Sequence, residues 1–353
     1  MISKSDLVYE DLKNSIQSGK YAIGTNLPNE IVFSKQLGIS RKTLRVALSQ
    51  LETENLIVRY KHRGTFVHKK SYKDKSAIVV IPRASYVDKS RFHSWFVAQY
   101  VLEGVFGHAR EDGMSMGLQY LHPDEYSLNE SVEILLKVNA GGYIFPSLGG
   151  YAGIIKELTS RGRCAVVRHW QALDFAHTLI PKEREATYSA VKYLINSGRR
   201  KIAFFGSPME ENVNFVERYL GYRHAMEDAD MPIVPEFHRI CCGYSEEAHS
   251  AAVKMLAEGV RPDAIFCGTD LRAFGIMQAL REAKIQIPED IALVGFDNLP
   301  ECEKMVPALS SIDTKLCHSG ELMCDIIKET IDCPGSGFIR RMLDCDFIKR
   351  DSC

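Results

Sequence analysis

Residues 262–298 read PDAIFCGTDLRAFGIMQALREAKIQIPEDIALVGFDN, and this stretch decides the fold of most of the chain. Two short apolar runs, 264–267 and 291–294, lie on either side of a segment with helical spacing, 271–283. Continuous apolar runs are typical of strands that are buried on both faces, as in parallel sheets. A parallel pair needs a crossover connection, so the stretch predicts one right-handed strand–helix–strand unit.

The same alternation extends outward in both directions from residue 77. Further strands are predicted at 77–82, 142–145, 164–167 and 201–205. Further helices are predicted at 97–112, 152–160, 185–197, 216–228, 246–257 and 320–330. Alternation on this scale predicts an α/β body, residues 77–353, with parallel sheets that helices cover on both faces. Its length suits two lobes better than one oversized sheet.

The charged residues are distributed unevenly along the chain, although its net charge is close to zero. The 353 residues carry a net charge of −1, with 45% hydrophobic and 25% charged residues, which is a soluble globular balance. Residues 1–75, however, hold 14 lysines and arginines against 7 acidic residues, which leaves the remainder at −8. A basic head on an acidic body suggests that only the head approaches a polyanion.

The basic head, residues 1–70, has a pattern of its own. Helices are predicted at 5–18, 30–37 and 41–55, and short strands at 57–60 and 65–68. Ser5 and Ser40 are the expected caps of the first and third helices. Leu44, Leu48 and Leu51 form the inward stripe of the third helix. The polar segment 71–76 is expected to be a linker to the body.

Several head residues have the chemistry that DNA recognition needs. The turn Gly38-Ile39-Ser40 between two short helices has the spacing of a helix-turn-helix. Arg41 and Arg45 share the face opposite the leucine stripe, where arginine can read guanine in the major groove. The hairpin tip places cations beside a glycine, as in a wing that contacts the minor groove or the backbone. The candidate DNA-binding residues are Ser40, Arg41, Lys42, Thr43, Arg45, His62, Arg63, Gly64 and Thr65.

Residues 7–67 resemble the winged helix-turn-helix of the GntR family. The resemblance rests on Gly19, Gly24, Leu27-Pro28-x-Glu30, the run from Leu37 to Arg45, Leu51-Glu52-x-Glu54-x-Leu56, and Arg63-Gly64-Thr65-Phe66-Val67. One position departs from the pattern. Ile31 stands where family members often carry an arginine that is available to DNA, which suggests an altered operator sequence.

The body lacks the motifs of the common enzyme classes. No dinucleotide-binding G-x-G-x-x-G follows a strand, and no phosphate-binding loop, nucleophile elbow or H-E-x-x-H is present. The ten cysteines are scattered, and Cys241-Cys242 do not have zinc or redox spacing. We therefore expect no catalytic residues, no cofactor and no metal. The N-terminus has no apolar signal region and no run is long enough to span a membrane, so we expect a cytoplasmic protein.

From about residue 77 to 353 the chain resembles the effector domain of the LacI family, itself similar to periplasmic sugar-binding proteins. The resemblance rests on 262–270, Ala273-x-Gly275, Ala279-Leu280, 288–298, 307–312, Glu217-Arg218-x-x-Gly221-Tyr222-Arg223 and Arg350-Asp351-Ser352. It implies a small carbohydrate effector bound between two lobes, and a homodimer.

Eight residues are candidates for contact with that effector. Open α/β sheets bind ligands beyond the carboxyl ends of their strands, where Asp270 and Asp297 stand, and a carboxylate there can accept hydrogen bonds from sugar hydroxyls. Arg218 supplies a planar fork of donors, and the resemblance assigns ligand contacts to Arg218, Asp270 and Tyr244. Core packing of Trp95 and Phe96, helix capping by Asp270 and turn capping by Asp297 are the structural alternatives. The full set is Trp95, Phe96, Arg168, Asn214, Arg218, Tyr244, Asp270 and Asp297.

Arg168 departs from the family pattern. It follows a predicted strand at a position where many LacI-type members have an aspartate that faces the sugar. If it lines the cleft, the pocket contains two arginines, and a uronic or phosphorylated sugar becomes an option.

The sequence thus predicts a DNA-binding transcription regulator, more often a repressor than an activator in this arrangement, controlled by a sugar or sugar-acid effector. A homodimer would require a roughly palindromic operator of double-stranded DNA. Two alternatives remain: a regulator whose body only dimerises or binds a protein partner, and an enzyme of sugar or nucleotide metabolism.

Overall fold

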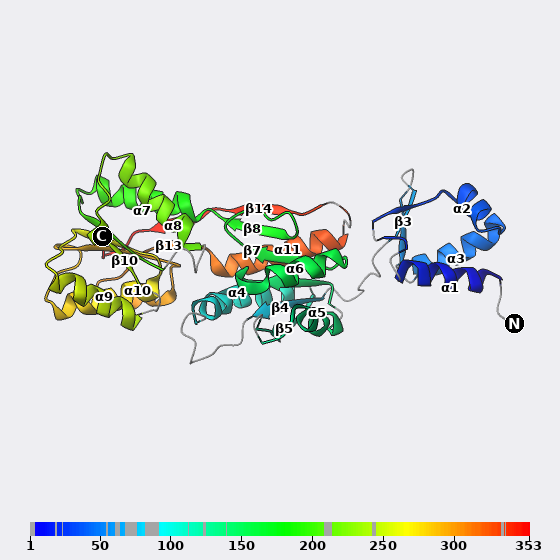
Figure 1. Ribbon diagram of the computed structural model, residues 1–353, viewed down its shortest axis with the longest axis horizontal. Helices are drawn as coiled ribbons and strands as arrows, with labels where there is room; N and C mark the ends of the chain where they lie inside the picture. The colour runs from blue at the N-terminus through cyan, green and yellow to red at the C-terminus, as the bar shows by residue number, and fades with distance from the viewer. Residues whose placement is uncertain are drawn as a thin grey trace.

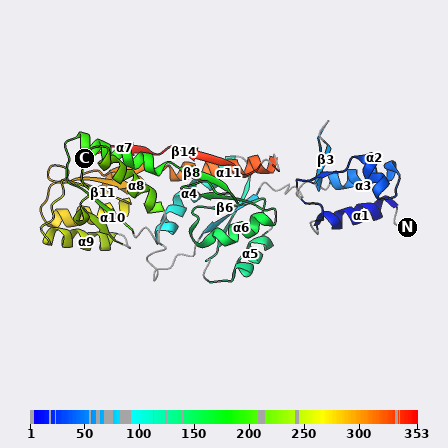
Figure 2. The same cartoon turned by 45° about the horizontal axis from the view of Figure 1, so that its top comes forward.

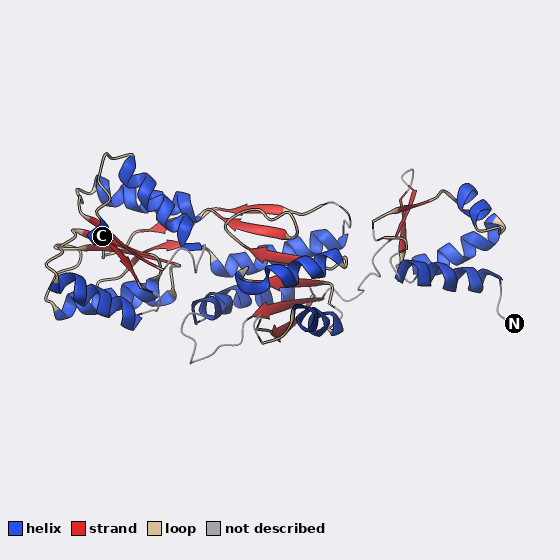
Figure 3. Ribbon diagram, viewed as in Figure 1, coloured by secondary structure: helices blue, strands red, loops and turns tan. Residues whose placement is uncertain are grey.

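The structure is a computed structural model of the 353-residue chain. It describes residues 4–17, 20–22, 24–53, 56–60, 64–67, 76–81, 92–111, 113–122, 125–138, 140–207, 214–241, 245–332, 335 and 337–353, without the side chains of residues 17, 92–97 and 214. The described residues form an N-terminal head and a two-lobed α/β body, and Figure 3 shows the strands of the body between layers of helix.

The head combines three helices with a small antiparallel sheet. Its elements are α1 (Lys4–Gln17), β1 (Asn26–Leu27), α2 (Glu30–Gln36), α3 (Arg41–Thr53), β2 (Ile57–Tyr60) and β3 (Gly64–Val67), with strand order β1-β3-β2. The predicted leucine stripe Leu44, Leu48 and Leu51 is buried in the core of the head, where Leu12 and Phe33 join it. The predicted helices and strands are confirmed, and β1 adds a third strand that the sequence pattern did not indicate.

The first lobe is built on an all-parallel sheet of order β14-β8-β7-β6-β4-β5. One face packs against α4 and α11, and the other packs against α5 and α6. The elements are β4 (Ser76–Ile81), α4 (Phe92–Glu111), β5 (Ser115–Tyr120), α5 (Leu128–Lys137), β6 (Gly142–Phe145), α6 (Ala152–Ser160), β7 (Cys164–Arg168), β8 (His177–Pro181), α11 (Leu316–Asp332) and β14 (Arg340–Leu343).

The second lobe has strand order β10-β9-β11-β12-β13-β15, in which only the β13–β15 pair is antiparallel. Figures 1 and 2 show α7 and α8 on one side of this sheet and α9 and α10 on the other. The elements are α7 (Glu183–Asn196), β9 (Ile202–Gly206), α8 (Asn214–Glu227), β10 (His238–Ile240), α9 (Ser245–Ala257), β11 (Ala264–Cys267), α10 (Asp270–Glu282), β12 (Ala292–Phe296), β13 (Ser310–Asp313) and β15 (Asp346–Ile348).

The described chain crosses between the lobes three times, at 181–183, 313–316 and 343–346. Two ion pairs join neighbouring crossings: Lys182 Nζ lies 2.6 Å from Asp344 Oδ1, and Lys315 Nζ lies 2.8 Å from Asp346 Oδ2. The predicted fold, two lobes of mainly parallel sheet with helices on both faces, is confirmed. Of the expected linker 71–76, only Ser76 lies within the described residues, and it begins β4.

Among the described residues, no helix is both long and apolar enough to cross a membrane.

Candidate functional site

The start of α3 presents a cationic surface. Ser40 caps the helix, since its Oγ accepts a hydrogen bond from the backbone N–H of Thr43 at 3.0 Å and lies 2.8 Å from the Thr43 hydroxyl. Arg41 and Lys42, the first two residues of the helix, are exposed. The cap therefore fixes the helix end while both cations extend into solvent. This is the arrangement that a recognition helix needs, because its first turn enters the groove.

Arg45, one turn further along α3, is half-exposed and paired. Its Nε donates to Glu30 Oε2 at 2.7 Å, and 59% of its side chain remains exposed. Glu30 begins α2, so the pair joins the two helices of the helix-turn-helix. Arg59 of β2 lies 4.0 Å from the other oxygen of the same carboxylate. Sequence reasoning quoted Glu30 within a family motif but assigned it no function, because its partner lies fifteen residues away.

The hairpin that carries the expected wing is described only in part. Gly64 begins β3 with φ +107°, a conformation that favours glycine, and a Cβ there would lie 2.7 Å from Asn26 Oδ1. Thr65 pairs with Leu27 of β1 and with Arg59 of β2. His62 and Arg63 lie outside the described residues. Ile31, at the departure from the family pattern, is exposed on α2.

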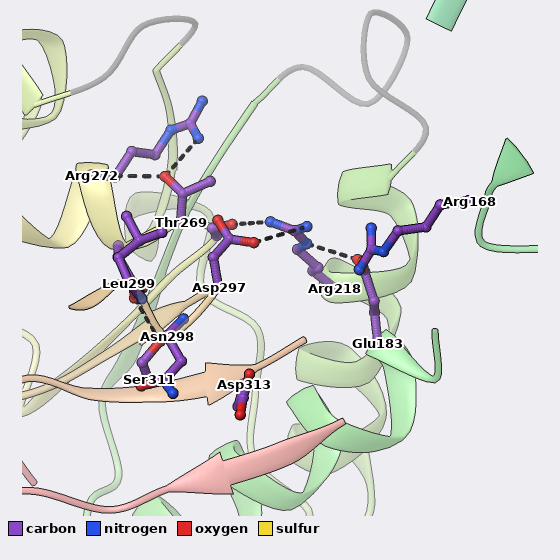
Figure 4. Close-up of polar contacts among 12 residues, drawn as sticks. Arg168, Glu183, Arg218, Thr269, Arg272, Asp297, Asn298, Leu299, Ser311 and Asp313 are labelled. Carbon is purple, nitrogen blue, oxygen red and sulfur yellow. Dashed lines mark hydrogen bonds and ion pairs between the residues drawn. The ribbon is translucent and has the colours of Figure 1, made fainter. Parts of the chain in front are cut away.

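A second polar cluster lies where the lobes meet. Arg168, the last residue of β7, places Nη2 3.3 Å from Glu183 Oε1, and Arg218 of α8 places Nε 2.9 Å from Glu183 Oε2. Figure 4 shows the two guanidinium groups close to this one carboxylate. All three side chains are buried, with 9%, 3% and 3% of Arg168, Arg218 and Glu183 exposed. The pKa of Glu183 is lowered, because Arg218 and Arg168 together outweigh the burial that opposes its charge.

The guanidinium group of Arg218 contacts a backbone carbonyl, two aromatic rings and a second carboxyl group. Its Nη1 donates to the carbonyl of Gly268, and its guanidinium lies 3.7 Å from the centre of the Phe296 ring and 5.1 Å from that of Phe215. Its Nη2 lies 3.8 Å from Asp297 Oδ1. Burial disfavours the charged guanidinium, yet the pKa of Arg218 is raised by Glu183 and Asp297. The side chain is therefore a fixed cation at the edge of the second lobe.

Asp297 has an unusual backbone. It follows β12 with φ +109°, and Asn298 after it has φ +54°, so two successive non-glycine residues occupy the left-handed region. Such a conformation costs about 1–3 kcal/mol per residue and is typical of functional sites. Burial raises the pKa of the Asp297 carboxyl to about 8, although Arg218 acts in the opposite direction. This backbone directs the carboxyl group toward Arg218.

Asp270 is fully buried, and both of its carboxylate oxygens accept hydrogen bonds from other residues of the protein. One carboxylate oxygen accepts from Ser311 Oγ at 2.6 Å and the other from Leu299 N at 2.8 Å, and the residue is fully buried. It therefore joins β13 to the loop after β12. The alternative in which Asp270 caps the following helix is wrong: α10 begins at Asp270, and Thr269 caps it by accepting from Arg272 N at 3.3 Å.

The structure does not describe the side chains of the other four expected effector contacts. Trp95 and Phe96 lie in the first turns of α4 and Asn214 begins α8, but their side chains are not described. Tyr244 lies outside the described residues. These four stay predictions. Sequence reasoning missed Glu183, because the helix was predicted to begin at 185 and the residue lies just before it, whereas α7 begins at Glu183.

The interlobe cluster has donors and carboxyl groups suited to binding a polar molecule. Arg218 and Arg168 offer guanidinium N–H groups, and Asp297 offers a carboxyl group that can donate or accept. Within the described ranges, no group of three or more histidine, cysteine, aspartate or glutamate side chains is arranged to hold a metal ion.

Comparison with known proteins identifies both parts of the chain. Residues 4–67 match the family of bacterial regulatory proteins called gntR, and residues 191–353 match the periplasmic binding protein-like domain. The chain is 32% identical over 169 residues to the HTH-type transcriptional repressor PurR of Escherichia coli O1:K1 and of Shigella sonnei strain Ss046. The match covers 47% of this chain and 49% of the relative, so the chain spans about half the length of the curated relatives it matches.

Solved structures of LacI-type regulators share the fold. The regulator CelR in complex with cellobiose superposes with a TM-score of 0.69 at 18% identity, over 93% of this chain and 100% of that one. A LacI family regulator from Enterococcus faecium with bound ribose gives 0.66 at 20% identity, over 78% and 98%. The lac repressor dimer bound to operator gives 0.65 at 17%, over 80% and 94%. The GntR-type resemblance of the head is confirmed by the family match, and the LacI-type fold expected of the body is confirmed by these structures.

Proposed function

We propose that the protein is a DNA-binding transcription regulator, a repressor, whose head recognises a specific operator and whose two-lobed body binds a small carbohydrate effector. The observation that carries this proposal is the start of α3. Inside the segment that matches the gntR family, a capped helix presents Arg41, Lys42 and Arg45 to solvent. The names of the sequence relatives, all repressors, agree with it.

The body supports regulation by a small molecule. Its fold is that of regulators solved with ribose and with cellobiose, and its buried polar cluster includes residues from both lobes. A ligand that contacts both lobes favours one arrangement of them over others. If two copies pair through their bodies, that preference alters the separation of the two heads, and by linkage the operator then alters effector affinity equally. We therefore propose a homodimer that binds a roughly palindromic site.

The test begins by selecting duplexes from a random DNA library with the full-length protein at modest ionic strength. We expect enrichment of one sequence with two related half-sites. Fluorescence anisotropy on that duplex, with and without a panel of monosaccharides, disaccharides and sugar acids, then measures coupling. We expect at least one compound to weaken operator binding.

Two results would contradict parts of this function separately. If no sequence is enriched over bulk competitor, with or without small molecules, the DNA-binding function is wrong. If an operator is found but no compound changes either its affinity or the melting temperature of the protein, the body serves dimerisation or a protein partner instead.

A further inference from the structure

Three arginines are buried where the lobes meet, and among the described residues they are not all paired with carboxylates. Arg168, Arg218 and Arg272 are all buried, with 9%, 3% and 2% of their surfaces exposed. Glu183 is shared between Arg168 and Arg218. A buried charge is costly unless it is paired, so the partners of each cation decide what the site lacks.

Arg272 has only neutral partners. Its Nε and Nη2 donate to the Cys241 carbonyl at 3.3 and 2.9 Å. Its Nη1 donates to Thr269 Oγ1 at 3.2 Å and its Nη2 to Ser207 Oγ at 2.5 Å. No carboxylate of the described chain lies within ion-pair distance of it. Arg272 also stands in the first turn of α10, where the helix dipole is positive and a cation is disfavoured. Among the described residues its charge therefore has no carboxylate partner, and its guanidinium lies 4.8 Å from the centre of the Phe215 ring.

Burial disfavours the ionised form of two of the carboxyl groups in this cluster, Asp297 and Asp270. Burial raises the pKa of Asp297 to about 8 and so opposes its ionisation, while Arg218 acts in the other direction. Burial also raises the pKa of Asp270, whose two oxygens already accept hydrogen bonds from Ser311 and Leu299. Among the described residues, Glu183 is the carboxylate that the two arginines Arg168 and Arg218 share.

Two buried donors near the end of β7 also lack an acceptor. Arg168 Nε and Trp170 Nε1 are shielded from water and have no hydrogen-bond partner in the described part of the protein. Figure 4 shows Arg168 extending toward Glu183, on the side opposite the bulk of the second lobe. Leaving a buried N–H unpaired costs free energy that a bound acceptor restores. The two residues are separated in the chain only by His169.

We propose that the effector is an anionic carbohydrate, and that its carboxylate or phosphate group binds Arg168 Nε and Trp170 Nε1, with the charge of Arg272, which has no carboxylate partner among the described residues, adding attraction at longer range. This inference rests on the proposed function and narrows its ligand to one class. Arg168 acts by direct contact, whereas Arg272, whose donors are largely occupied, acts through its charge.

The experiment is calorimetric titration of the full-length protein with matched sets of probes. Each set contains a neutral sugar, its uronate and its phosphate ester: glucose, glucuronate and glucose 6-phosphate, then the galactose counterparts. Inorganic phosphate serves as a minimal anion. We expect at least one acid to bind at least about tenfold more tightly than its neutral counterpart, and inorganic phosphate to bind weakly at the same site. The uronate and phosphate arms distinguish the two sources of negative charge.

Substitutions at Arg168 and Trp170 test whether these side chains bind the anionic group. Arg168→Gln should remove the preference for acids and abolish phosphate binding, whereas Arg168→Lys should retain part of both. Trp170→Phe keeps an aromatic side chain, though a smaller one, and loses the N–H, so it should weaken acid binding several-fold without affecting neutral sugars. The matched control is Arg161→Gln, a surface arginine of the same lobe that pairs with Glu133 and Glu157. It should bind every probe as the wild type does.

The two proposals fail in different ways. If neutral sugars bind as tightly as acids, inorganic phosphate does not bind, and Arg168→Gln changes nothing, the anionic effector is wrong while a carbohydrate effector stands. If no sugar or acid binds although the operator is still recognised, both the effector proposal and this inference are overturned. Melting temperatures of the variants, close to that of the wild type, exclude misfolding as the reason for lost binding.

Discussion

Arg45 and Glu30 form a 2.7 Å ion pair that ties the third helix of the head to the second. The arginine belongs to the surface that would face DNA, and the glutamate belongs to the motif that opens α2. A cation held in this way is oriented before it meets a base, which lowers the conformational entropy that binding must overcome. We therefore propose that this ion pair contributes to the selectivity of the head for its operator.

Arg45→Ala should weaken binding to the selected operator by about 1–3 kcal/mol and change binding to random duplex little. The reason is that a base contact contributes only where the right base is present. Anisotropy titrations on both duplexes measure the difference. Lys35→Ala, which removes the same charge from the last turn of α2, is the control and should affect both duplexes alike. Equal losses for Arg45→Ala on the two duplexes would assign the residue to phosphate contact.

Glu30→Gln should lower the ratio of operator affinity to random-duplex affinity. The substitution removes a negative charge near the DNA-facing surface, which strengthens non-specific binding, and it releases the Arg45 side chain from its fixed orientation. The ratio is measured by competition with bulk DNA at several salt concentrations. An unchanged ratio would show that the ion pair has no part in recognition.

Gly104→Ala should destabilise the first lobe by about 1–3 kcal/mol, through overpacking between α4 and α11. A Cβ at Gly104 would collide with the backbone carbonyl of Cys317, which cannot move without the helix. Gly107, one turn along the same helix, has nothing within 4 Å of the equivalent Cβ. Gly107→Ala should therefore stabilise by about 0.5–1 kcal/mol. Differential scanning calorimetry of the two variants gives opposite shifts if the helices pack as described.

The free energy of unfolding should depend on pH through Asp297. Its pKa in the folded protein is about 8, well above the usual 3.8, so between these values the folded state retains a proton that the unfolded state releases. This contribution to stability is complete below about pH 4 and is lost as the pH rises toward 8. Denaturation of the wild type and Asp297→Asn across this range should show a shallower decline in the variant. If the free energies of unfolding of both proteins decline in parallel, titration of Asp297 does not contribute to the pH dependence of stability.

Much of the fold could be predicted because buried parallel strands have a distinctive composition. The apolar runs at 142–145 and 264–267 coincide with β6 and β11. β5 was missed, because it is an edge strand whose residues Leu118 and Tyr120 are exposed and whose pattern is mixed. The order of strands in each sheet, and the return of α11 to the first lobe, depend on contacts between distant segments that local patterns do not encode.

The site was predictable in part for the same reason. Arg168 and Asp297 were found because they stand at the ends of strands, where ligands bind in open sheets. Their partners could not be found in this way. Glu183 meets Arg168 and Arg218 only because the chain crosses between lobes at that residue, and the neutral surroundings of Arg272 arise from three separate loops.

Because the chain crosses between the lobes three times, the first lobe is built from segments that are synthesised far apart in time. The core of the first lobe includes Met323, Ile327 and Leu343, all from the last 40 or so residues, against strands that begin at residue 76. During translation the sheet face that α4 and α11 cover together therefore stays incompletely covered until residues 316–343 have been synthesised. The head, complete by residue 67, can fold far earlier. Nascent chains that end before α11 should consequently contain a folded head and an unfinished first lobe, detectable as a protease-resistant N-terminal fragment.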